Sequence, residues 1–89
     1  MEQKFIAAFE ANRAEAEKYG ARMRPIDVKG AKRILSGSRT SDGWGALQTK
    51  GRLDLSLEAL VIHRQFTSLF TDEEANTALD RLLAAGYYF

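Results

Sequence analysis

The chain has 89 residues, of which 45% are hydrophobic and 28% charged, and its formal net charge is +1. These values predict one small folded domain rather than a disordered chain, and the absence of cysteine excludes disulfides and thiolate metal sites. No apolar run approaches the roughly 20 residues that a membrane helix needs, so we expect a cytoplasmic protein with no membrane contact.

The first predicted helix covers residues 2–19. Phe5 and Phe9 lie four residues apart on one helical face, and the many alanines of this stretch favour a helix. Gly20 is expected to end it, because glycine readily adopts the left-handed conformation that follows a last helical turn. The apolar stripe is narrow, so we expect this helix to dock on a helical core formed by residues 27–89.

A second helix is predicted at residues 28–36. Pro25, the only proline, prevents a helix from running through the preceding connector, residues 20–26. Asp27 is the expected N-cap, since its side chain can accept a hydrogen bond from a free backbone N–H of the first turn. The polar, glycine-containing residues 36–43 that follow predict a loop.

The third predicted helix contains Trp44 and Leu47 and ends at Gly51. Either Ser41 or Asp42 is expected to cap its N-terminus. Glycines on both sides of the tryptophan weaken this helix by roughly 1 kcal/mol each relative to alanine. They also indicate close packing or a turn at this point.

The leucine-rich stretch in the middle of the chain is expected to lie at the centre of the core. Residues 52–55 alternate between polar and apolar, and with no second strand to pair with they predict an extended lead-in. Ser56 is the expected N-cap of a fourth helix at residues 57–64. Asp54 and Glu58 lie four residues apart and are interpreted as carboxylates on a solvated surface.

The last helix has the clearest signals. Thr71 and Glu74 have the spacing of a capping box, and Gly86 is expected to end the helix, with Tyr87 in hydrophobic contact. The predicted buried face comprises Ala75, Ala78, Leu79, Leu82 and Leu83. Together the elements predict an all-α fold, a single compact domain of about five short helices spanning residues 1–89.

Charge is distributed unevenly along the chain. Residues 19–52 contain eight basic and two acidic residues, whereas residues 53–89 contain two basic and six acidic ones. Two interpretations stay open. The basic middle could bind an acidic or phosphate-rich partner, or its cations could pair with the acidic end within the same molecule.

Aromatic residues are the second indication of a partner. The chain contains Trp44 and ends in Tyr87, Tyr88 and Phe89, and a chain this small cannot easily bury all of them. Exposed tryptophan and tyrosine side chains are typical anchors of protein interfaces. A protein partner or a homodimer is therefore expected.

No arrangement of residues typical of catalysis or metal binding is visible. His63 is the only histidine, and no nucleophile or orienting carboxylate completes a recognisable set around it. The acidic residues 72–74 are explained by capping rather than by a calcium loop. We expect no enzymatic activity, no cofactor and no metal.

These observations predict a small helical interaction module, a regulator or accessory protein that binds a macromolecular partner, with a protein favoured. The alternative is a nucleic-acid-binding module that uses the basic residues 22–52 to contact phosphates. The candidate binding residues are Arg22, Arg24, Lys29, Lys32, Arg33, Arg39, Trp44 and Tyr88.

Overall fold

The computed structural model describes residues 1–87 and, within them, consists of helices joined by turns and loops, which confirms the predicted all-α fold. The five α-helices of this part agree with the expected number. These helices and two short 3-10 turns are α1 (Glu2–Glu17), α2 (Val28–Ser36), α3 (Trp44–Thr49), η1 (Leu53–Leu55), α4 (Leu57–Val61), η2 (Thr67–Leu69) and α5 (Asp72–Ala84).

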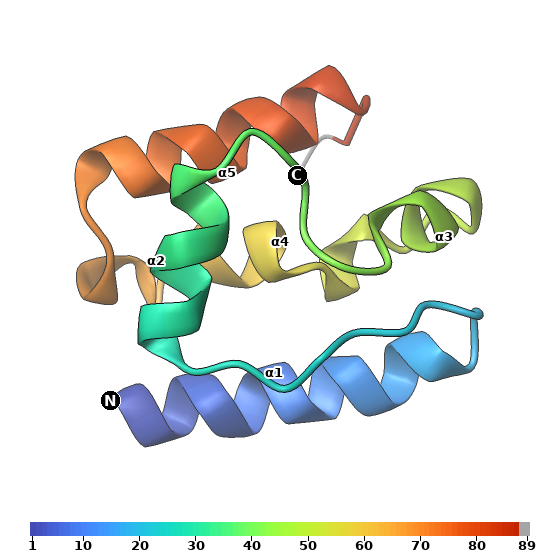
Figure 1. Cartoon of the computed structure of the whole chain (residues 1–89), viewed down its shortest axis with the longest axis horizontal. Coiled ribbons are helices and arrows are strands. Elements are labelled where there is room, and N and C mark those ends of the chain that lie inside the picture. Colours follow the sequence, from blue (N-terminus) through green and yellow to red (C-terminus); the bar gives the residue numbers. More distant parts are fainter. Residues whose placement is uncertain (88–89) are drawn as a thin grey trace.

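The two longest helices, α1 and α5, form opposite edges of the molecule (Figure 1). The short α4 lies between them and contacts both. Helix α2 also contacts both and spans the distance from one edge to the other. The connector before α2, α2 itself and the loop after it therefore share one face of the molecule.

Aromatic contacts join α1 to the turn between α4 and α5. Phe5 is fully buried, and its ring meets Phe66 and Phe70 edge to face, with centroid distances of 5.5 and 5.4 Å. Pairs of this geometry stabilise by about 0.5–1.5 kcal/mol beyond the burial of their surface. Leu57 in α4 and Leu82 in α5 are fully buried as well, so all three helices contribute to one core.

Three of the predicted N-caps are present. Asp27 accepts a hydrogen bond at 2.8 Å from the amide three residues later, at the start of α2. Ser56 does the same at 3.2 Å at the start of α4. Thr71 and Glu74 form the predicted capping box of α5. Caps of this kind contribute about 1 kcal/mol each, which helps such short helices to form.

The cap of α3 differs from the prediction, because neither Ser41 nor Asp42 caps this helix. Both side chains are hydrogen-bonded elsewhere, and α3 begins directly after Gly43. Gly43 has a φ of 78°, and a Cβ placed on it would lie 3.0 Å from the Cβ of Ala21. A glycine is therefore required here both for the backbone conformation and for the close approach of the connector.

Leu53–Leu55 form a 3-10 turn, so the predicted extended lead-in at residues 52–55 is wrong. Leu53 and Leu55 are nevertheless buried, as expected. The Ser56 hydroxyl donates a hydrogen bond to the Leu53 carbonyl at 2.6 Å. This local side-chain bond favours a closed turn over an extended backbone.

Helix α1 ends at Glu17 rather than at residue 19, α4 is shorter than the pattern predicts, and α5 has a narrower buried face. Helix α4 ends at Val61 rather than at residue 64, because the chain turns there to bring Phe66 into the core. In α5, Leu79 is only partly buried and Leu83 is 44% exposed. The buried face of α5 is therefore narrower than the predicted stripe.

The neighbouring leucines of α5 provide a matched test of this core. Leu82→Ala is expected to lower the free energy of unfolding by about 2–5 kcal/mol, because it empties a fully buried site. Leu83→Ala, one residue away on the same helix, is expected to change it by less than about 1 kcal/mol. Urea unfolding of both variants measures the difference, and equal losses would contradict this placement of the core.

Candidate functional site

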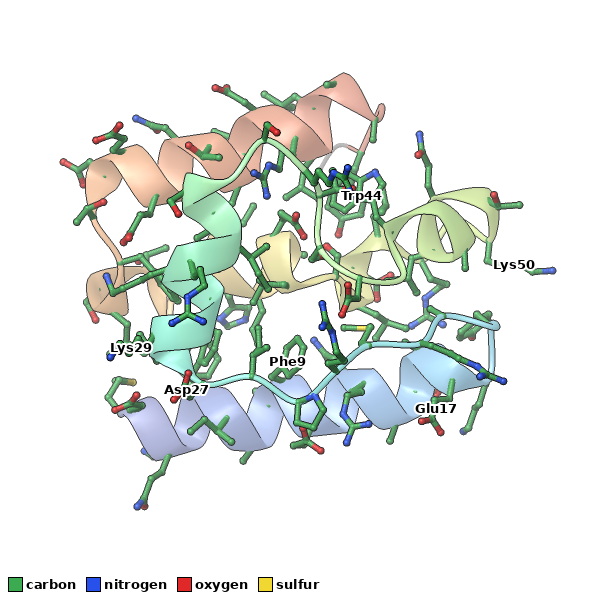
Figure 2. All side chains as sticks on the ribbon, in the orientation of Figure 1. Phe9, Glu17, Asp27, Lys29, Trp44 and Lys50 are labelled. Carbon is green, nitrogen blue, oxygen red and sulfur yellow. The ribbon has the colours of Figure 1, made fainter. Side chains whose placement is uncertain are left out.

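Residues 20–43, which carry six of the eight cations of the basic middle, lie on one face of the molecule. The connector, α2 and the loop 37–43 pass in front of the remaining helices in the view of Figure 1. In Figure 2, Lys29 lies at the α2 side of the molecule and Lys50 at the far end of α3. The basic residues are therefore spread over the molecule and do not all converge on one point.

Part of this positive charge is used within the molecule. Lys32 forms an ion pair with Glu74 at 2.8 Å, and Arg52 forms one with Asp54 at 3.0 Å. Both partners belong to the acidic end of the chain, so internal pairing accounts for these two cations. The exposed basic residues of 19–52 that make no ion pair within residues 1–87 are Arg22, Lys29, Arg33, Arg39 and Lys50.

Lys32 has a structural role, which removes it from the exposed basic set. Its Nζ lies 5.3 Å from the centroid of the Phe70 ring and also contacts Glu74. Burial raises the pKa of Glu74, but hydrogen bonds from Lys32 and from the Thr71 amide outweigh burial and lower this pKa. Lys32 thus joins α2 to the start of α5.

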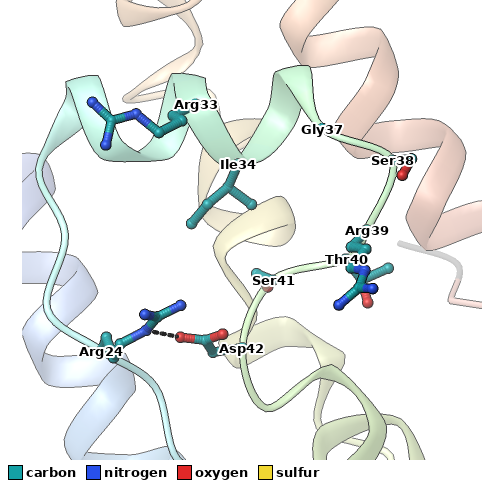
Figure 3. A pocket seen from close by; sticks show the side chains of 9 residues that line it. All are labelled: Arg24, Arg33, Ile34, Gly37, Ser38, Arg39, Thr40, Ser41 and Asp42. Carbon is teal, nitrogen blue, oxygen red and sulfur yellow. Dashed lines mark hydrogen bonds and ion pairs between the residues drawn. The ribbon is translucent and has the colours of Figure 1, made fainter.

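A hollow of about 430 Å³ opens between the connector, the end of α2 and the loop 37–42. Figure 3 shows Arg24 and Arg33 on one side of it, Arg39 on the other, and the side chain of Ile34 pointing into it. We refer to it as the arginine hollow. It brings together three of the predicted binding residues, which come from the connector, α2 and the following loop, and it adds Ile34, which the sequence analysis did not select.

A buried carboxylate holds the loop wall of the arginine hollow in place. Glu58 is 0% exposed and accepts hydrogen bonds from the amide and the hydroxyl of Ser41, at 2.9 and 2.6 Å. It also pairs with Arg81 at 3.2 Å. Arg81 in turn donates to the Gly37 carbonyl at 2.8 Å and to the Ile34 carbonyl at 3.4 Å. One ion pair therefore anchors both ends of the loop.

The interpretation of Glu58 as a solvated surface residue was wrong. A signal was present in the sequence, because Leu57 and Leu60 place the same short helix inside the core. A carboxylate in such a helix needs a cation for charge compensation, and Arg81 is the only basic residue of α5. Which face of α4 meets α5 depends on the packing of the two helices, so the pairing itself could not be read from spacing.

Arg24 closes the arginine hollow toward the connector. Its Nε donates a hydrogen bond to Asp42 at 2.9 Å (Figure 3). This hydrogen bond lowers the pKa of Asp42, against the opposing effect of partial burial. The rim therefore contains three arginines and one aspartate, which leaves two positive charges facing solvent.

The aromatic candidate that the structure describes, Trp44, is less exposed than predicted. Trp44 packs against the hydrophobic core and is only partly exposed, while Tyr88 lies outside the described residues. Burial, together with the nearby charge of Asp54, raises the pKa of Tyr87. Within residues 1–87, the large hydrophobic side chains that are exposed are Met1 and Leu83. Among the residues that the structure describes, the arginine hollow is thus a better candidate site than an aromatic patch.

Along residues 1–87, none of the helices combines the length and the apolar character required to cross a membrane. Comparisons with family models, with curated proteins and with solved structures give no match to this chain. A function must therefore be inferred from the chemistry of its own surface.

Removing the buried charge tests the role of the network behind the hollow. Glu58→Gln leaves the Arg81 guanidinium, whose side chain is 12% exposed, without a counter-charge, and is expected to cost about 3–5 kcal/mol of unfolding free energy. Glu10→Gln, which breaks a partly exposed ion pair with Arg13 within one helix, is the control and should cost less than about 1 kcal/mol. Chemical denaturation compares them, and a loss for Glu58→Gln as small as the control would refute the anchoring role.

The Arg24–Asp42 contact predicts a pH dependence. Because the folded-state pKa of Asp42 is lowered, the pair stabilises the fold above the ordinary aspartate pKa of about 4. This contribution is lost as the pH falls through the lowered value. In Arg24→Gln the pKa of Asp42 should rise, which an NMR titration of its carboxyl carbon measures. An unchanged titration would show that the two side chains are not paired in solution.

Proposed function

We propose that this protein is a small helical interaction module, a regulator or accessory protein that binds an acidic surface of a partner protein. The contact surface is the face formed by the connector, α2 and the loop 37–42, with the arginine hollow at its centre. The single observation that carries the proposal is the exposure of Arg33 and Arg39 at this hollow, where neither has an ion pair within residues 1–87.

The pairing pattern of the whole chain supports a partner. Three of the six acidic residues of 53–89, Asp54, Glu58 and Glu74, pair with Arg52, Arg81 and Lys32, yet Arg33 and Arg39 stay outside these pairs. Arginine is enriched in protein interfaces because its planar guanidinium binds a carboxylate with two hydrogen bonds. The exposed arginines of the hollow can therefore bind carboxylates of another chain.

A protein is favoured over a nucleic acid by the overall charge. The net charge is only +1, and the exposed Asp72 and Glu73 in the first turn of α5 would repel a stiff, densely charged duplex that extends beyond the basic face. A local basic surface on a nearly neutral molecule fits a local acidic surface of similar size. Such complementarity mainly accelerates association and selects the partner, so binding should be transient and sensitive to salt.

Binding of nucleic acid through the basic residues 22–52 is the second candidate function. One observation favours it: the loop that carries Arg39 also brings the hydroxyl residues Ser38 and Thr40 to the hollow. Arginine and hydroxyl side chains are common donors to phosphate oxygens. Binding of this kind would weaken steeply with salt, because phosphate contacts release counterions.

An NMR titration of labelled protein distinguishes the two candidates. We expect poly-L-glutamate to shift the amide signals of residues 22–42 at low salt, whereas duplex DNA leaves them nearly unchanged. The double variant Arg33→Gln/Arg39→Gln should weaken the response to polyglutamate by about tenfold or more, consistent with the loss of two charge-assisted contacts.

The control removes the same charge elsewhere. Lys4→Gln/Arg64→Gln changes two exposed basic residues outside the basic segment and should bind polyglutamate nearly as well as the unchanged protein. Salt-sensitive shifts on residues 22–52 with DNA alone would instead support the nucleic-acid candidate. If neither polymer shifts the amide signals of the folded protein, both candidate functions are refuted.

A further inference from the structure

The arginine hollow combines an apolar floor with a charged rim, and this combination specifies a ligand more closely than charge alone. We infer that it holds an apolar side chain of the partner protein that is flanked along the chain by acidic residues. This inference rests on the proposed function, because it names the chemistry of the segment that binds to the same face.

The floor of the hollow is Ile34. Its side chain points into the open space (Figure 3), and it is partly exposed while packing against the hydrophobic core. A second, much smaller cavity of about 10 Å³ shares Ile34 with the hollow and is also lined by Phe9, Met23 and Leu57. The apolar floor is therefore continuous with the core, and a partner side chain placed on it would lose part of its contact with water.

The rim complements acidic residues on both sides of such an anchor. Arg24 and Arg33 lie on one side of Ile34 and Arg39 lies on the other (Figure 3). With Asp42 bound to Arg24, two positive charges remain, which matches two carboxylates. A single compact anion could not use the isoleucine between the arginines, whereas a peptide with separated charges can use all of these groups.

The loop 37–42, which forms one wall of the hollow, supplies backbone N–H donors. It is already held in place before a ligand binds. The amides of residues 38–40 form no hydrogen bond to any group within residues 1–87, so they can donate to an incoming peptide. Behind them, Glu58 and Arg81 already hold the loop through Ser41 and Gly37. A site held in place before binding loses less conformational entropy when the ligand arrives.

Two capped peptides of equal charge test the inference, Glu-Glu-Leu-Glu-Glu and Glu-Glu-Ser-Glu-Glu. The unchanged protein is expected to bind the leucine peptide about fivefold tighter, because partial burial of one leucine side chain adds to the ionic contacts. Methyl NMR should show the Ile34 signal shifting with the leucine peptide and much less with the serine peptide.

Variants assign the preference to the floor of the hollow. Ile34→Thr is expected to bind both peptides equally. Ile62→Thr, a partly exposed isoleucine that also packs against the core but does not line the hollow, should keep the fivefold preference. If Ile34→Thr does not fold, the comparison of the two peptides on the unchanged protein still decides whether an apolar side chain contributes to binding.

The outcomes separate this inference from the proposed function. Equal, salt-sensitive binding of both peptides to the unchanged protein would overturn the apolar anchor and leave the acidic partner surface standing. A retained leucine preference in a folded Ile34→Thr variant would place the anchor elsewhere and overturn the inference too. If neither peptide binds and polyglutamate does not bind either, both the apolar anchor and the proposed binding of an acidic partner are overturned.

Discussion

The ion pair between Glu58 and Arg81 is the constraint on which the arrangement of this molecule depends. It connects α4 and α5 directly, and through Ser41, Gly37 and Ile34 it connects both to the end of α2 and to the following loop. A fully buried carboxylate is tolerated only when its charge and its lone pairs are satisfied. The hydrogen bonds to the loop are therefore part of what makes the buried charge possible, and the loop conformation follows from them.

Some cations form internal ion pairs and others stay exposed, and this division explains how a nearly neutral protein presents a basic face. Arg81 neutralises the buried Glu58, and Lys32 neutralises Glu74 at the start of α5. Both cations tie helices together. Arg33 directly follows Lys32 and Arg39 lies in the loop after α2, but both stay exposed. Structural and exposed cations thus alternate within a few residues, and the second group is available to a partner.

The aromatic core holds α1 in place, and through Phe70 it also contacts the cation of Lys32. Phe5 packs between Phe66 and Phe70, and Gly43 lets the connector that follows α1 approach the loop closely. The connector is then positioned so that Arg24 reaches Asp42. Apolar packing on one side and the buried ion pair on the other together define the two walls of the arginine hollow.

Local signals accounted for much of the fold and for a smaller part of the candidate site. The all-α class, the N-caps of α2, α4 and α5, and the ends of the helices near glycine depend on residues within three or four positions of one another. The predicted cap of α3 failed because Ser41 forms its bonds with Glu58, 17 residues away. Because this bond joins residues far apart in sequence, the local pattern could not show that Ser41 does not cap α3.

The sequence by itself determined that the chain forms short helices and that its positive charge is concentrated in residues 19–52. Only the tertiary structure decided which of those cations are paired, that Glu58 is buried, and that Ile34 lies between arginines. The bond from Arg81 to the Ile34 carbonyl spans 47 residues. Periodicity reports which face of a helix is apolar, but the partner that each face meets depends on how all the helices pack at once.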